Sequence, residues 1–394
     1  MALANVSATA RLAASWRDPA KRAFALQVLA VALVAAFILW VAGNVLDNLA
    51  RLNIASGFGF FDERAGFGVP TSLIQFTPES SYLRALSVGV LNTLLISTMG
   101  IVAATVLGFI MGIARLSSNW LIRALATAYV EGLRNIPLLL QIFFWYFAVL
   151  GALPQPRQAL SISDSVFLSN RGLVLPLPIP QDYFWLTAVV LLLSLVGWFF
   201  YRNWLARQRR LKGRVAHPRW IGPAIIVLPT LACWLLTGGP LTWSMPHLQG
   251  FRFVDGLTIV PELVAVWFAL SIYTGAFIAE VVRGGILAVD RGQTDAARAI
   301  GLTRGQRLRL VVVPQALRVI TPPLTNQYLN LTKNSSLGAA VGYPELMNVS
   351  GTILNQTGQA VEVLAVTMAI YGSICLAIAT LMNKFNTFVG IEER

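Results

Sequence analysis

Long apolar runs separated by short polar stretches dominate the pattern of this chain. Eight of them reach the roughly 17–25 residues that a helix needs to cross a bilayer. They are Phe24–Gly43, Ala85–Ile113, Ala124–Leu150, Tyr183–Tyr201, Trp220–Leu236, Val260–Val282, Pro323–Met347 and Val361–Lys384. The pattern predicts an all-α polytopic membrane protein. The first run lacks a clear small-residue cleavage site after it, so we expect it to remain as an anchor.

Composition supports this fold class. Of 394 residues, 56% are hydrophobic and 12% are charged, and the mean hydropathy is +0.67. A soluble protein of this size could not bury so much apolar surface. The net charge of +13 would suggest nucleic acid as a partner of a soluble protein, but here the positive-inside rule explains it, and no nucleic-acid partner is expected.

The distribution of basic residues sets the predicted orientation. Residues 202–219 between the fourth and fifth runs carry seven basic side chains and no acid, and Arg11, Arg17, Lys21 and Arg22 precede the first run. Residues 283–318 are also rich in arginine, whereas acids and bases balance in residues 44–84. An even number of spans with both termini on the cytoplasmic side satisfies each of these loops.

The character of the runs divides the chain into four parts. Residues 1–82 hold the tail, the first run and an external loop, and residues 83–150 hold two runs of a core. Residues 151–259, with two plain runs and Pro-rich flanks, have the composition of an insertion. Residues 260–394 complete a five-span core and include a polar loop at residues 283–320.

This polar loop contains a Gly-punctuated, Arg-rich stretch, residues 292–314. Thr294 or Asp295 is expected to cap a short helix, and Gly301 to end it, since glycine enters the left-handed conformation without steric hindrance. Small side chains then form a smooth knob suited to a groove on another protein, namely Ala296, Ala297 and Ala299.

A second helix is expected after the knob. Thr303 and Gln306 have the spacing of a capping box, and Pro314 is expected to end the helix, because proline has no N–H for the ladder. These features alone are also compatible with an ordinary cytoplasmic turn between two spans.

The spacing of the loop resembles the EAA loop of ABC importer permeases. That motif has Glu-Ala-Ala, three residues, Gly, nine residues and an aliphatic-any-aliphatic-Pro ending. Here Asp295 replaces the glutamate, and Gly301 and Pro314 stand at the matching positions. Other segments are similar to the polar amino-acid and general L-amino-acid permeases, namely residues 53–61, 131–141, 314–318, 326–337 and 343–346.

The resemblance implies a type I ABC importer fold with about eight spans, in a bacterial inner membrane. Such a permease pairs with a second permease or its own copy, receives L-amino acids from a periplasmic binding protein, and is driven by two cytoplasmic ATPases. The ATPases hold ATP and magnesium. This chain lacks the G-x-x-x-x-G-K-[ST] phosphate loop and is expected to bind no cofactor and catalyse no reaction. The ATPase-coupling residues would be Asp295, Ala296, Ala297, Gly301 and Pro314.

Polar side chains within the runs are the candidates for a translocation pathway. They are Gln141, Asn330, Lys333, Asn334 and Ser335. A lysine in the bilayer costs on the order of 3 kcal/mol unless it is paired or hydrated. Lys333 could attract the carboxylate of the substrate, snorkel from a helix end, or pair with Glu345 or Glu131. Interhelical hydrogen bonds are the simpler explanation for Gln141 and for Asn92 and Thr93.

Two other function classes remain as alternatives. A secondary, ion-coupled carrier would need carboxylates in mid-membrane, and most acids near the runs lie toward their ends. A membrane enzyme would need a nucleophile or metal constellation. The histidines, His217 and His247, and the cysteines, Cys233 and Cys375, have no ligand spacing, so no metal site is expected.

Overall fold

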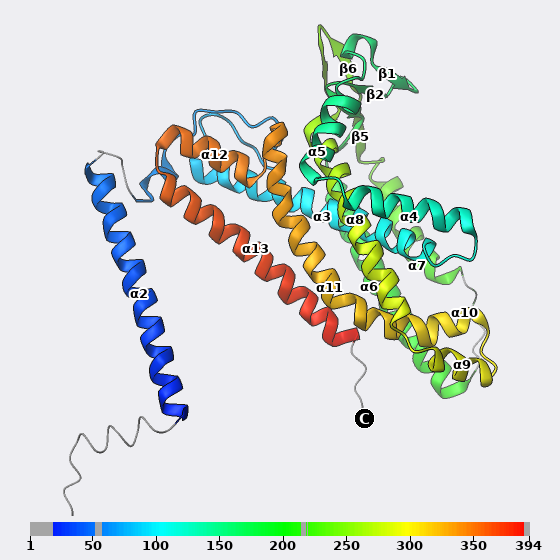
Figure 1. Ribbon diagram of the computed structural model, residues 1–394. Coiled ribbons are helices and arrows are strands. Elements are labelled where there is room, and N and C mark those ends of the chain that lie inside the picture. Colours follow the sequence, from blue (N-terminus) through cyan, green and yellow to red (C-terminus); the bar gives the residue numbers. More distant parts are fainter. Residues whose placement is uncertain (1–18, 52–56, 214–217, 219, 390–394) are drawn as a thin grey trace, which may run out of the picture. The chain divides into compact units, whose positions relative to one another are not determined.

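The computed structural model describes residues 19–51, 57–213, 218 and 220–389 (Figure 1). Several positions used in the sequence analysis lie outside these residues, namely Arg11, Arg17, Arg214, Arg219 and residues 53–56. The chain divides into two compact units. One comprises Met1–Leu95 with Pro344–Arg394, and the other is Ile96–Tyr343.

The first unit is built from helices. Its elements are α2 (Pro19–Arg51), the 3-10 helix η1 (Gly59–Asp62), the first part of α3 (Tyr82–Ala114), α12 (Leu346–Thr357) and α13 (Ala360–Val389). The apolar window of α2 is not buried by any described residue. Its side chains therefore need lipid or another protein as their surroundings.

The external loop of the first unit folds back onto these helices. Phe60 and Tyr82 are buried in one cluster with side chains of α12 and α13. The backbone N–H of Gly57 donates to Glu362 at 2.8 Å, and the Tyr82 hydroxyl donates to Gln356 at 3.0 Å. Apolar burial and these bonds together hold the loop in one arrangement.

Polar side chains of α3 secure the start of α12. The Asn92 amide donates to the Pro344 carbonyl at 2.8 Å, and the Thr93 hydroxyl accepts from the Leu346 N–H at 3.0 Å. Glu345 caps α12 by accepting from two backbone N–H groups of its first turn. The prediction of hydrogen bonds between elements for Asn92 and Thr93 is confirmed.

The second unit contains the remaining helices. After the rest of α3 they are α4 (Trp120–Arg134), α5 (Leu138–Phe143), the π-helix η2 (Phe144–Leu150), η3 (Pro156–Gln158), α6 (Phe184–Lys212), α7 (Ile221–Leu236), α8 (Pro261–Leu287), α9 (Arg291–Ala299), α10 (Arg304–Arg307), the π-helix η4 (Leu308–Val312), α11 (Val313–Asn334) and the 3-10 helix η5 (Ser335–Val341).

Helix α8 is the most buried of the candidate spans, and glycines let its neighbours approach it. A Cβ on Gly108 of α3 would lie 2.4 Å from Ile278, and one on Gly112 would lie 2.6 Å from the Ala279 carbonyl. A Cβ on Gly285 would lie 2.3 Å from Ile320 of α11. Small residues spaced four apart are a common means of close helix packing in membranes.

Eight short strands, which the sequence analysis did not predict, flank α6 and α7. They are β1 (Leu160–Ile162), β2 (Val166–Ser169), β3 (Gly172–Leu175), β4 (Leu177–Pro180), β5 (Leu241–Ser244), β6 (His247–Gln249), β7 (Arg252–Val254) and β8 (Leu257–Ile259). All pairings are antiparallel, in a four-stranded sheet of order β1-β2-β3-β8, a two-stranded sheet of β4 and β5, and the hairpin β6-β7.

These strands lie at the opposite end of α8 from the polar loop. Strand β8 leads into the first residue of α8, and α9 and α10 follow its last residue (Figure 1). Strands β3 and β8 come close because Gly172 has a φ of +114° and no side chain, and a Cβ there would lie 2.2 Å from the Ile259 carbonyl. Helix α8 therefore runs from the strand region at its first residue to the polar loop at its last.

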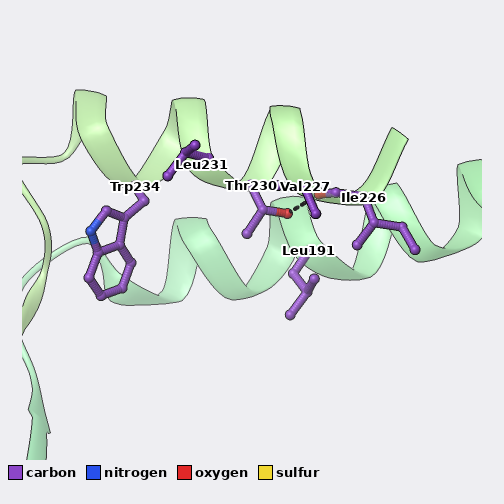
Figure 2. A pocket seen from close by; sticks show the side chains of 6 residues that line it. All are labelled: Leu191, Ile226, Val227, Thr230, Leu231 and Trp234. Atoms are coloured by element: carbon purple, nitrogen blue, oxygen red, sulfur yellow. Dashed lines mark hydrogen bonds between the residues drawn. The ribbon is translucent and has the colours of Figure 1, made fainter. Parts of the chain in front are cut away.

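Helices α6 and α7 pack side by side, and an apolar groove of about 330 Å³ runs between them (Figure 2). It is lined by Leu191, Ile226, Val227, Thr230, Leu231 and Trp234. The Thr230 hydroxyl donates to the Ile226 carbonyl at 2.7 Å, which satisfies its polar group within α7. The groove therefore presents a surface suited to lipid chains.

Five described helices are long and apolar enough to cross a membrane, or six spans if one bent pair is counted. The five contain the predicted runs that begin at Phe24, Ala85, Tyr183, Val260 and Val361, apart from the first residues Tyr183 and Val260, which each precede their helix. Helix α7 matches another run but has 16 residues. The count of eight spans stays a prediction.

Two predicted runs have the wrong helix bounds. Residues 124–150 form a pair of helices bent by 105°, because Pro137 lacks an N–H and excludes a helical residue before it. Residues 323–347 are not one helix either. Helix α11 ends at Asn334, and η5 ends at Gly342 with a φ of +80°, a conformation that glycine adopts without strain.

The placement of the strands and the polar loop predicts labelling from opposite sides of the membrane. In a background with Cys233→Ser and Cys375→Ser, Ser161→Cys in β1 should react with a membrane-impermeant maleimide in intact cells. Gly305→Cys in α10 should react only after permeabilisation. Both side chains are exposed, so burial does not limit either reaction. Labelling of both cysteines in intact cells would contradict this arrangement.

Candidate functional site

The polar loop begins with a capped helix, α9. The Asp290 side chain accepts from the Gly292 N–H at 2.6 Å, so Asp290 is the N-cap. The predicted caps, Thr294 and Asp295, lie inside the helix, and that prediction is wrong. Asp290 directly follows the apolar run of α8, which is the position where a cap residue signals a new helix start.

Helix α9 ends in a Schellman motif around Gly301. The Gly301 N–H donates to the Arg298 carbonyl at 3.0 Å, and the Leu302 N–H donates to the Ala297 carbonyl at 3.1 Å. Gly301 has a φ of +81°, as this motif requires. The prediction that Gly301 ends the helix in the left-handed conformation is confirmed, and the exit direction of the chain is fixed by two hydrogen bonds.

The second helix of the loop begins with the predicted capping box. The Gln306 N–H donates to the Thr303 hydroxyl at 3.4 Å, and the Thr303 N–H donates to the Gln306 side chain at 2.9 Å. Pro314, however, does not end this helix. The π-turn of η4 precedes it, with the Val313 N–H bonded to the Leu308 carbonyl, and the wider turn lets the helix continue past a residue without an N–H.

The surface of α9 is small and apolar where the knob was predicted. Ala296 and Ala299 are exposed, as is Asp295, whereas Ala297 is buried. The most prominent apolar group is Ile300, which is 77% exposed and was not among the predicted residues. Ile300 lies beside the exposed Ala296 and Ala299, so the tip of α9 is small and apolar.

Arginines surround this apolar surface. Exposed guanidinium groups project from α9, α10 and η4, at Arg291, Arg298, Arg304 and Arg309. The only acids in residues 290–314 are Asp290 and Asp295. The loop therefore has an apolar tip within a basic rim.

Helix α11, which follows the loop, has two different faces. Ile320, Leu324 and Leu331 are buried. Polar residues on the other face, Asn326, Asn330 and Lys333, are exposed within the chain. Their spacing of four and three residues places them along one stripe of the helix.

Lys333 forms no ion pair with any described residue, and the carboxylates considered as its partners have other contacts. Glu131 accepts from Arg115 at 3.1 Å. Glu345 accepts from the Met347 and Asn348 N–H groups and from the Tyr371 hydroxyl, at 2.6–2.8 Å. Within its own unit, the geometry thus gives no support to a structural pair of Lys333 with Glu131.

The other predicted pathway residues lie in different surroundings. Asn334 is half-buried, and Ser335 is buried and donates to the Thr332 carbonyl at 2.7 Å. Gln141 is buried and donates to the Leu133 and Ile136 carbonyls at 3.0 Å each. Those carbonyls lie at the bend between α4 and α5, so the Gln141 amide stabilises the bend.

The described residues contain no group of three His, Cys, Asp or Glu side chains that could hold a metal ion. His247 lies 3.4 Å from Asp255 in the strand region, and Cys233 and Cys375 are free thiols. The candidate site therefore has two parts. One is the exposed apolar surface of α9, which is suited to contact with another protein, and the other is the polar face of α11, whose lysine can attract a negative charge.

Comparisons with known proteins agree with this arrangement. Residues 220–389 match the family described as binding-protein-dependent transport system inner membrane component. The chain is 50% identical to the putative amino-acid ABC transporter permease protein YhdX of Escherichia coli (strain K12), over 96% of this chain and 97% of that protein. It is 47% identical to the general L-amino acid transport system permease protein AapQ of Rhizobium johnstonii, over 96% and 94%. It is 38% identical to the glutamate/glutamine/aspartate/asparagine transport system permease protein BztB of Rhodobacter capsulatus, over 96% of each.

The capping box predicts how the loop responds to loss of one hydroxyl. Thr303→Ala removes the cap of α10, which costs about 1 kcal/mol. Trypsin cleavage at Arg304 and Arg307 should then become about fivefold faster, because cleavage follows the population of the open loop. Thr303→Ser keeps the hydroxyl and should be cleaved at the wild-type rate. Equal rates for Ala and Ser would show that the capping box does not hold the loop.

Proposed function

The chain belongs to the family of amino-acid ABC transporter permeases, and from that premise we propose how its parts divide the work of import. It is the membrane component of an ABC importer for amino acids and is not itself an enzyme. The observation that carries the proposal is the fixed, exposed α9 knob. Hydrolysis of ATP, with magnesium, takes place on separate ATPase subunits, which must be linked mechanically to the membrane helices.

Helix α9 is the link in this proposal. Ala296 and Ala299, with Ile300, would enter a groove of an ATPase subunit, and Asp295 would lie at the rim of that groove. The buried Ala297 holds α9 against the rest of the loop. The Schellman motif at Gly301 supports this role because a fixed exit transmits displacement, whereas a flexible one would absorb it.

The orientation follows from this role. The loop and both termini lie on the cytoplasmic side of an inner membrane, where two ATPases bind, and the strands lie on the periplasmic side. A periplasmic binding protein delivers the L-amino acid there. The arginines of residues 283–318 on the loop side, which fit the positive-inside rule, support this orientation.

A pathway along α11 would explain its exposed polar stripe. Charged and polar residues within membranes face a protein interior or a water-filled cavity. Within this chain no described side chain covers Asn326, Asn330 and Lys333. A second permease, a different chain or a copy of this one, would complete the cavity, and Lys333 would attract the α-carboxylate of the substrate. Asn334 and Ser335 would lie at the edge of this pathway. Gln141 would not line it, because its amide stabilises the bend between α4 and α5.

Family membership favours this mechanism over the secondary carrier. The matched relatives are ABC transporter and amino-acid transport permeases. An ion-coupled carrier is supported by none of them.

Gly301→Val tests the coupling role of α9. Valine at a φ of +81° is strained, so the exit of α9 should be distorted. Insertion into the membrane should be unchanged. Copurification with the ATPase and amino-acid uptake should each fall at least tenfold, which corresponds to a loss of about 1.4 kcal/mol or more in the free energy of ATPase binding. The measurements are membrane abundance, ATPase recovery by pull-down, and uptake.

Gly305→Val is the matched control. Gly305 lies in α10 with an ordinary φ, and a Cβ there meets nothing within 4 Å, so this variant should retain uptake. Wild-type uptake by Gly301→Val at normal abundance would refute the coupling role.

Lys333→Met tests the pathway. Removing a charge from a membrane-embedded site is not destabilising by itself. The complex should therefore assemble with an unchanged melting temperature, and hydrolysis of ATP stimulated by the binding protein should persist. Uptake should fall about tenfold, since the attraction of the carboxylate is lost.

Lys384→Met in α13 is the control for loss of a lysine, because Lys384 is exposed and lies in another helix. Full uptake by Lys333→Met would indicate a snorkelling lysine outside the pathway. A lowered melting temperature, restored by Glu345→Gln or Glu131→Gln, would instead indicate a structural pair.

A further inference from the structure

Four charged side chains form a cluster where α3, α4 and α8 meet. Arg115 follows the last residue of α3, Glu131 lies in α4, and Glu280 and Arg283 lie in α8. Arg115 donates to Glu280 with one terminal nitrogen and to Glu131 with the other, the latter at 3.1 Å. Arg283 donates to Glu280 through its Nε at 3.2 Å. One guanidinium group therefore connects three helices.

Burial of Arg115 distinguishes this cluster from an ordinary surface pair. The Arg115 side chain is 11% exposed and Glu280 is 31% exposed, while Glu131 is 56% exposed. Both side chains of the pair formed by Arg64 and Glu79 in the external loop are exposed, by 61% and 72%. The planar Arg115 guanidinium thus holds two separate carboxylates through hydrogen bonds between charged groups, which are short and directional.

The surrounding contacts tie the same three helices together. The Tyr129 hydroxyl of α4 donates to the Ile272 carbonyl of α8 at 2.8 Å. Gly112 of α3 places its backbone against Ala279 and Val282 of α8. The Arg134 guanidinium lies 5.0 Å from the Phe277 ring centre. Hence the cluster lies in a packed interface, where displacement of one helix affects the others.

The cluster is also close to the loop along the chain. Helix α8 ends at Leu287, and α9 begins at Arg291 after a link of only Ala288–Asp290. Glu280 lies about two turns before the end of α8. A force on α9 is passed to α8 through this short link, and the charged connection from α8 to α3 and α4 is through Glu280 and Arg115.

We propose that Arg115 and Glu280 are positioning residues that transmit the displacement of α9 from α8 to α3 and α4. The proposal rests on the proposed function, since it requires α9 to be moved by an ATPase. It adds that the displacement of the polar loop reaches the other helices through one guanidinium group that bridges two carboxylates. Stability alone does not require such a contact, because apolar groups of similar volume serve a buried interface equally well.

Two changes separate transmission from stability. Arg115→Lys keeps the positive charge but replaces the planar fork by a point charge, which cannot hold both carboxylates in fixed geometry. Arg115→Gln combined with Glu280→Gln removes both charges of the central pair. Glu131 and Arg283 each lose a partner, but they are 56% and 32% exposed and keep contact with solvent. Arg64→Gln combined with Glu79→Gln makes the same replacements in the exposed pair and serves as the matched control.

The experiment uses the complete complex with its ATPase in liposomes, a purified binding protein, and a radiolabelled mixture of L-amino acids. We measure stimulated ATP hydrolysis, uptake, and melting temperature. The wild-type complex must show hydrolysis stimulated by the binding protein together with uptake. If it does not, the proposed function fails, independently of the cluster.

Given a coupled wild type, the amount of amino acid transported per ATP should fall about tenfold in the double variant and by a smaller factor in Arg115→Lys. The hydrolysis rate and melting temperature should stay near those of the control. Unchanged transport per ATP in Arg115→Lys would overturn the proposal, as would uptake and hydrolysis that fall together with the melting temperature. Should the double variant fail to assemble, Arg115→Lys decides the result alone.

Discussion

Close packing of α8 against its neighbours is the constraint on which the second unit depends. Gly108 and Gly112 of α3 and Gly285 of α8 leave no room for a Cβ, so the helices meet with backbone against side chain. The same helix carries β8 at one end and the link to α9 at the other. A rigid α8 therefore connects the strand region with the loop, and the Arg115 cluster lies along that connection.

The bilayer explains why the chain is incomplete by itself. Backbone and polar groups in the membrane need partners within protein or water. Most polar side chains of the helices meet this demand within the chain, as Thr230 and Ser335 do. The exposed polar stripe of α11 does not. On the loop side, the exposed Ile300 is an apolar group left uncovered. In the proposed function these two surfaces are the places that other subunits contact.

The all-α membrane fold and some local features of the polar loop could be predicted from the sequence, whereas the strands and the path of the chain at Pro314 could not. The Thr303–Gln306 capping box and the conformation of Gly301 follow from spacing alone and are found in the structure. The strands could not be predicted, because segments of three or four residues carry little periodicity and β4 pairs with β5 about sixty residues away. The sequence wrongly predicted that the helix ends at Pro314. The helix continues because a π-turn precedes the proline, and no particular residue type marks such a turn in a sequence. The Arg115 cluster joins the consecutive helices α3 and α4 to α8, with Arg115 and Glu280 separated by 165 residues, so it is visible only in the fold.

The central claim is that α9 enters a groove of an ATPase subunit, and a cross-link at its tip tests this most directly. A photoreactive amino acid at Ala296, which is exposed, is activated in membranes of the native host, and the cross-linked partner is identified by mass spectrometry. The main cross-linked partner should be an ABC ATPase subunit, and Gly301→Val should abolish the product. A cross-link to lipid alone, or to a periplasmic protein, from a normally inserted chain would contradict it.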